Sequence, residues 1–191
     1  QELDTDSEWW WDQNNAQLYL WPPGNVNPNN VTVETSVLEN GFQVEWGRSW
    51  VTIRDLQFQH QKVAGIRIDG AEHILISNCE FTKLYMGVSS YGNDNSYLNN
   101  YFHGTYATAI SILDDNSVIN YNVLNDIAMV PGQGESNWGY FGIRTQGDGN
   151  EVRHNRLENI GYIGIGTNGS TLIEYNYIDN AVALLNDGGG I

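Results

Sequence analysis

The chain has 191 residues and a formal net charge of −15, from eight Lys and Arg against 23 Asp and Glu. This balance disfavours nucleic acid and anionic membrane surfaces as partners, because phosphate binding needs a basic face. No apolar run approaches the roughly 20 residues of a membrane-spanning helix. An acidic, Asn- and Gly-rich, lysine-poor composition with seven tryptophans indicates a secreted or periplasmic protein.

Residues 1–40 differ in character from the rest of the chain. Two aromatic runs, Glu8–Asp12 and Leu18–Gly24, flank a turn-like stretch and predict a hairpin that ends at a double proline. An exposed tryptophan row here would stack on sugars, whereas a covered row would pack on the following domain. We expect the second arrangement, with 1–40 as a lead-in packing on a domain formed by 41–191.

An internal repeat organises the remainder of the chain. A small residue followed by a β-branched one recurs from Gly65-Ile66 to Gly190-Ile191 at intervals of 22, 22, 33, 22 and 26 residues. A fixed period in this range is typical of a solenoid. Apolar and polar residues alternate with period two, without helical spacing or leucine runs, so each unit fits three short strands. The predicted fold is all-β, a parallel β-helix with coils of about 22 residues.

One polar position recurs in every coil, two residues before an inward apolar residue. Its occupants are Cys79, Asn100, Asn122, Asn155 and Asn176. Amides stacked on strands about 4.8 Å apart can form hydrogen bonds along the solenoid axis. We therefore expect a structural asparagine ladder. Cys79, the single cysteine, is expected to point inward, which excludes a disulfide framework.

Several segments together resemble right-handed parallel β-helix proteins of the pectate-lyase-like superfamily. They are the lead-in runs Glu8–Asp12 and Leu18–Pro23, the first coil Val51–Phe58 and the closing Asn186–Ile191. The resemblance implies a right-handed solenoid and a polysaccharide-active protein of bacterial glycoside-hydrolase type. The reaction stays open, because this superfamily hosts lyases, hydrolases, epimerases and adhesins. Gly190-Ile191 begins a strand with no cap following, so we expect a fragment of a longer chain.

Two insertions interrupt the repeat, at 125–141 and 180–189, with excesses of 11 and four residues. Insertions in repeat proteins map to loops on one face, often the binding face. Both leave the coil after its third strand, so the two loops are expected roughly 10 Å apart, walling a cleft over 157–163. The groups expected to point into this cleft are Asp126, Glu135, Trp138, Tyr140, Asn186 and Asp187.

Carboxylates near these loops are the candidate catalytic groups: Asp187, Glu135, Glu158 and Asp179. Glu158 and Asp179 share an outward position on adjacent coils, about 5 Å apart at the backbone, which resembles the carboxyl spacing of retaining glycosidases. Asp187 precedes three glycines that allow a ligand to approach closely. In so acidic a chain the alternative is plain surface or turn carboxylates. The candidate substrate contacts are Trp138, Tyr140, Arg144 and Asn186.

We expect an extracellular glycoside hydrolase acting on a neutral glycan without a cofactor. Two alternatives stay open, and the first is a non-catalytic adhesin or structural protein that self-associates end to end by strand pairing. The second is a polysaccharide lyase, which would need Ca²⁺ or a basic groove. Arg67 and Arg144 lie about 14 Å apart, and acidic clusters are confined to Asp114-Asp115 and Asp148 in turns. The four histidines show no zinc-ligand spacing.

Overall fold

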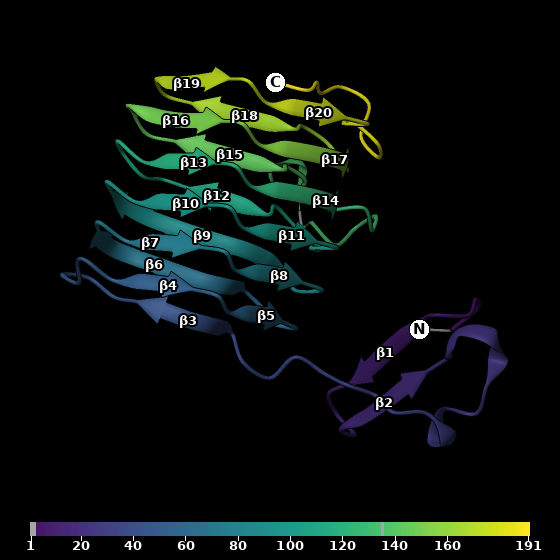
Figure 1. Ribbon diagram of the computed structural model, residues 1–191. Coiled ribbons are helices and arrows are strands. Elements are labelled where there is room, and N and C mark those ends of the chain that lie inside the picture. The colour runs from purple at the N-terminus through teal and green to yellow at the C-terminus, as the bar shows by residue number, and fades with distance from the viewer. Residues whose placement is uncertain (1–2, 135) are drawn as a thin grey trace. The chain divides into compact units, whose positions relative to one another are not determined.

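The computed structural model describes residues 3–134 and 136–191 and divides into two compact units, 1–35 and 36–191 (Figure 1). The first unit contains the predicted hairpin, in which β1 (Trp9–Asp12) pairs antiparallel with β2 (Gln17–Leu20). Two short 3-10 turns follow, η1 (Pro23–Asn25) and η2 (Pro28–Asn30). No helix among the described residues is long and apolar enough to cross a membrane. Packing of the lead-in on the coils stays a prediction.

The second unit is the predicted parallel β-solenoid, with three six-stranded parallel sheets among its described residues (Figure 1). The first sheet contains β3 (Asn40–Val44), β6 (Ala64–Glu72), β9 (Met86–Asn93), β12 (Ile110–Ile112), β15 (Ile143–Gln146) and β18 (Ile165–Asn168). The second contains β4 (Thr52–Arg54), β7 (Leu75–Ser77), β10 (Ser96–Leu98), β13 (Val118–Asn120), β16 (Asn150–Arg153) and β19 (Thr171–Glu174). The third contains β5 (Gln57–Gln59), β8 (Glu80–Thr82), β11 (Tyr101–His103), β14 (Val123–Ile127), β17 (Arg156–Ile160) and β20 (Tyr177–Asp179).

The small residue of the repeat marker has a packing reason. Phe58, Phe81 and Phe102 stack along the solenoid axis, with ring centroids 5.1 and 4.6 Å apart. A Cβ placed on Gly65 would lie only 2.6 Å from Cδ1 of Phe81. Glycine therefore lets the first sheet approach the phenylalanine stack, and the β-branched residue after it fills the core, as Ile66 does at 0% exposure.

The predicted asparagine ladder is confirmed. The side-chain amides of Asn100, Asn122 and Asn155 each donate to the side-chain oxygen of the next asparagine along the axis, at 3.0 Å in every case. At the first rung, the backbone N–H of Cys79 donates to Oδ1 of Asn100 at 2.9 Å. Burial raises the pKa of the Cys79 thiol, so this residue stays neutral and structural.

A second, mixed ladder lies at the corner between the first and second sheets and was not predicted. The backbone N–H groups of Ile74, Asn95 and Ser117 donate, each at 2.9 Å, to side chains one coil further on. Next to it the fully buried carboxylate of Asp114 accepts from the hydroxyl of Tyr97 at 2.6 Å. Burial, and then the neighbouring carboxylate, raise the pKa of the Tyr97 phenol well above its usual value. This network makes the corner rigid.

Candidate functional site

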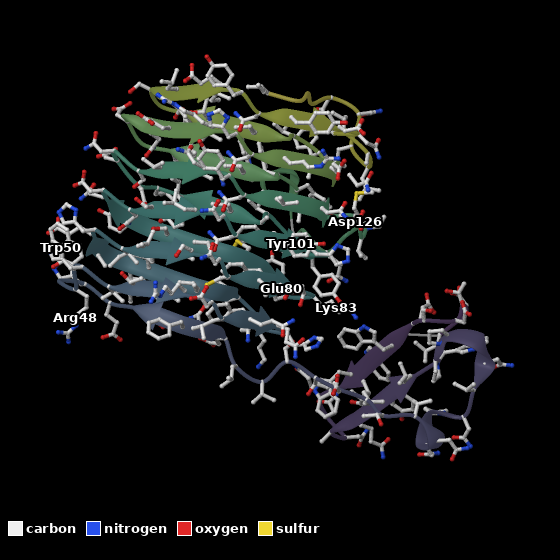
Figure 2. The ribbon with its side chains drawn as sticks, viewed as in Figure 1. Arg48, Trp50, Glu80, Lys83, Tyr101 and Asp126 are labelled. Carbon is white, nitrogen blue, oxygen red and sulfur yellow. The ribbon has the colours of Figure 1, made fainter. Side chains whose placement is uncertain are left out.

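A groove of about 510 Å³ runs along this corner, across four successive coils. It is formed by the turn after β3, the ends of β6 and β9, and the segment after β12. Figure 2 labels Arg48 in this turn and the neighbouring Trp50, at one edge of the coils. We call it the corner groove, and its side chains of chemical interest are Trp46, Arg48, Glu72, Tyr91, Asn93 and Asp115.

Aromatic faces form one part of the corner groove. The Trp46 side chain is 76% exposed, and its ring lies directly against Gly70, where any Cβ would overlap the indole. Gly70 also has a φ of +70°, so both its backbone and its missing side chain are required here. Tyr91, 56% exposed, lies on β9, one coil beyond Gly70 and two coils beyond Trp46. These two rings give the groove flat apolar surface open to solvent.

Two carboxylates stand in one column along the corner groove. Glu72 is in register with Asn93, and Asn93 with Asp115, in parallel pairing. Glu72 and Asp115 are therefore two strand spacings apart, about 10 Å at the backbone. Oδ1 of Asp115 accepts a hydrogen bond from the backbone N–H of Asp148 at 2.7 Å, which fixes the orientation of this carboxylate.

The charge of the groove is slightly negative. Its described lining contains one cationic side chain, Arg48, and two carboxylates, Glu72 and Asp115. Outside the lining, Asp69 is held by Arg67 through an ion pair of 2.8 Å. The arrangement offers hydrogen-bond donors and acceptors beside aromatic faces, with no excess positive charge to attract an anionic polymer.

The two insertions leave the coil where they were expected. One follows β14 and the other follows β20, with β17 between them in the third sheet. The segments beside β17 pack closely on the coils, because Tyr140 and Tyr162 are 7% and 9% exposed and belong to the core. The backbone N–H of Tyr162 donates to the carbonyl of Tyr140 at 3.0 Å, and that of Val182 to the carbonyl of Tyr162 at 2.7 Å. These segments thus continue the ladder of the solenoid.

Of the predicted carboxylates, Glu158 and Asp179 are brought to neighbouring strands, directly in register. Oε1 of Glu158 is bound by Nη2 of Arg156 at 2.5 Å, and Asp179 accepts from the hydroxyl of Tyr177 at 3.5 Å. Both carboxylates lie on the outward side of the third sheet. Their catalytic roles stay predictions.

The Asp187 loop contacts the core tyrosine of the neighbouring coil. The Tyr162 hydroxyl donates to the carbonyl oxygen of Asp187 at 3.5 Å. The nearby Asp187 side chain, together with burial, raises the pKa of Tyr162. Asp187 and Asn186 are exposed, and Glu135 lies outside the described residues. The roles predicted for these three residues stay untested by the geometry.

Trp138 and Arg144 meet, as expected for two residues of one site. The guanidinium carbon of Arg144 lies 4.8 Å from the centre of the Trp138 ring. They line a second cavity, of about 270 Å³, together with Phe141, Ile163 and Ile165. No carboxylate occurs among the described residues of its lining. We call this cavity the loop hollow.

A charged patch on the third sheet includes Lys83, Tyr101 and Asp126, which Figure 2 labels. Nδ1 of His103 lies 3.6 Å from Oδ2 of Asp126, and both side chains are about 40% exposed. The patch is therefore solvated surface. Among the described residues, no group of three or more His, Cys, Asp or Glu side chains is arranged to hold a metal.

The main residues of the corner groove were missed at the sequence level. One local signal was the turn Trp46-Gly47-Arg48-Ser49-Trp50, which places two tryptophans and an arginine between strands. A second was the spacing of Glu72, Asn93 and Asp115 by 21 and 22 residues, which matches the repeat and predicts a shared column.

Comparison with known proteins agrees with the architecture. The family model described as right handed beta helix region matches residues 40–191, more than three quarters of the chain. No curated protein and no solved structure matches the chain. The matched range begins at the first residue of β3 and includes every strand of the three sheets. The chain therefore belongs to the right-handed β-helix family.

Proposed function

We propose that this protein is a glycoside hydrolase that binds an oligosaccharide or polysaccharide chain in the corner groove. The main support is that one groove holds two aromatic faces, Trp46 and Tyr91, beside two carboxylates, Glu72 and Asp115. Aromatic rings provide flat apolar area for the faces of sugar rings, and most glycosidases act through a pair of carboxyl groups. Membership of the right-handed β-helix family is compatible with carbohydrate activity.

The spacing of the two carboxylates favours an inverting reaction. Inverting enzymes hold their carboxyl groups about 6.5–9.5 Å apart, because a water molecule must fit between one group and the sugar. The backbones of Glu72 and Asp115, about 10 Å apart, are nearer to this spacing than to the roughly 5 Å of retaining enzymes. In contrast, Glu158 and Asp179 lie on neighbouring strands, with backbones about 5 Å apart, which corresponds to the carboxyl spacing of retaining enzymes.

In the proposed reaction, Glu72 donates its proton to the glycosidic oxygen while the bond from that oxygen to the anomeric carbon breaks. Asp115 takes a proton from water, whose oxygen bonds to the anomeric carbon from the opposite face. Asp115 suits the role of base because the N–H of Asp148 holds its Oδ1 and leaves Oδ2 for the water. The products are two shorter chains, the new reducing end having inverted configuration.

The substrate class that fits the groove is a neutral glycan. The net charge of −15 repels polyanions. Within the described lining, the positive charge of Arg48 is outnumbered by the two carboxylates. Arg48 can instead donate hydrogen bonds to sugar hydroxyls. A polymeric substrate of this kind agrees with the secreted or periplasmic location expected from composition.

Release of reducing ends from neutral polysaccharides such as xylan, mannan, cellulose and laminarin tests the proposal. Glu72→Gln and Asp115→Asn should each lower turnover about 100-fold or more, the usual contribution of a general acid or base, while binding persists. Trp46→Ala should weaken binding instead. Glu158→Gln and Asp179→Asn are matched controls, being the same changes in the other carboxylate pair.

Three outcomes would replace the proposal. Loss of activity in Glu158→Gln and Asp179→Asn alone would move the chemistry to the third sheet. Binding without any cleavage by the unmodified protein would favour a non-catalytic adhesin. Release of unsaturated sugars that depends on added Ca²⁺ would favour a polysaccharide lyase.

A further inference from the structure

The loop hollow holds a positive charge that no described side chain neutralises. Arg144 points outward from β15, in the same column of the first sheet as Arg67. Arg67 is bound to Asp69 at 2.8 Å, whereas Arg144 has no ion-pair partner among the residues that the structure describes. In a chain with a net charge of −15, an unpaired guanidinium is an exception that calls for a binding partner.

The surroundings of Arg144 are largely apolar. Its neighbours in the lining include Phe141, Ile163, Ile165 and Ile191. Burial lowers the pKa of Arg144, in agreement with partial removal of its charge from water. The guanidinium is stacked over Trp138 at 4.8 Å, and a stacked guanidinium keeps its in-plane N–H groups free for a planar acceptor.

The threonine hydroxyls of the hollow are already hydrogen-bonded. Among its threonines, Oγ1 of Thr145 lies 3.2 Å from Oγ1 of Thr171, and Thr167 donates to the same Thr171 hydroxyl at 2.9 Å. A ligand rich in hydroxyl groups would find its free partners limited to Arg144 and Asn168, and unpaired buried polar groups are costly. An apolar ligand with a single anionic group suits the hollow better.

The hollow is also held in shape by the coil beneath it. The Thr108 hydroxyl, buried at 2% exposure, donates to the carbonyl of Trp138 at 3.3 Å and accepts from the N–H of Phe141 at 3.2 Å. The Trp138 and Phe141 rings are nearly parallel, 5.8 Å apart at 2°. This bracing places the indole under Arg144 before any ligand arrives.

We propose that the loop hollow binds a small carboxylic acid with a flat apolar body, such as an aromatic acid. The carboxylate would accept two in-plane hydrogen bonds from Arg144, and the ring would lie against Trp138, Ile163 and Ile191, the apolar lining residues that are not buried. The size agrees, since a protein cavity of about 150 Å³ is enough for benzene and the loop hollow measures about 270 Å³. This site shares no lining residue with the corner groove and does not depend on the proposed hydrolase activity.

Titration with benzoate, by calorimetry or ligand-observed NMR at about 0.15 M salt, tests the proposal. Saturable binding is expected, and Arg144→Gln should weaken it at least about tenfold. Trp138→Ala should also weaken it, whereas Arg67→Gln, the same change in the same column, should leave it unchanged. Benzamide, which lacks the charge, should bind at least about tenfold more weakly to the unmodified protein. That comparison holds even if a variant fails to fold.

Several results would overturn the assignment. Absence of saturable benzoate binding would contradict the site itself. Equal affinities for benzamide and benzoate would show that the carboxylate is not recognised. Acetate binding as tightly as benzoate would remove the role of the apolar body. Tighter binding of glucuronate would mean a sugar acid site instead.

Discussion

Removing one amide from the middle of the asparagine ladder gives a sharp test of what stabilises the coils. In Asn122→Leu, the replacement has a similar volume but no polar atoms. Oδ1 of Asn122 accepts the N–H of Asn100 at 2.9 Å, and its Nδ2 donates to the carbonyl of Tyr97 at 2.9 Å. Both backbone groups lose this partner in the interior of the protein.

The expected cost follows from these two groups. Each buried polar group left without a partner costs about 1–3 kcal/mol, so the variant should lose about 2–6 kcal/mol of unfolding free energy. That is a large part of the roughly 5–15 kcal/mol typical of a domain. Urea unfolding gives the total, and hydrogen exchange of the Asn100 amide reports the local loss.

A position on the same ladder supplies the control. Asn176 is partly exposed at the last rung, so water can replace its hydrogen bonds, and Asn176→Leu should cost less than half as much. A change within about 0.5 kcal/mol for Asn122→Leu, the range of neutral surface substitutions, would refute the structural role of the ladder. An equal cost for both variants would also contradict it.

Two further predictions concern the corner. Gly70→Ala should destabilise the fold by about 1 kcal/mol because of its φ of +70°, and it should weaken glycan binding by displacing Trp46. Gly47→Ala is the control, because Gly47 has a φ of +74° but open space around it, so this variant should lose stability without losing glycan affinity. Urea unfolding measures the loss of stability and a glycan titration measures the loss of affinity. Equal glycan affinities of the two variants would contradict the role of the contact between Gly70 and Trp46. Because the folded pKa of Tyr97 is raised, its stability contribution is complete below the unfolded pKa of about 10 and should fall as pH rises above it. Tyr97→Phe should abolish this loss above about pH 10.

The solenoid could be predicted because equivalent residues recur at a regular interval along the sequence. Ile53 and Phe58 pair with Ile76 and Phe81, the equivalent residues one coil further on. The asparagine ladder was predictable for the same reason, since identical residues recur at one position. The second ladder was not predicted because Ser117 stands between Asn95 and Asn150 in its column, so no single residue type recurs from coil to coil.

The location of the candidate site was harder to predict. Turn residues of four successive coils form the corner groove. Its shape depends on the packing of the Trp46 ring against Gly70, and no local sequence pattern predicts that contact. The site was predicted at the two insertions because of their extra length. Two aromatic residues of the longer insertion, Tyr140 and Phe141, are buried against the coils, so part of its length packs on the solenoid and is not exposed loop.

The configuration of the first product formed by the unmodified protein tests the central claim most directly. Proton NMR of the anomeric region, recorded early in hydrolysis of a susceptible neutral oligosaccharide, shows which anomer appears before mutarotation. Action by Glu72 and Asp115, two strand spacings apart, predicts the inverted anomer first. A retained anomer would contradict this account and point to the adjacent pair, Glu158 and Asp179.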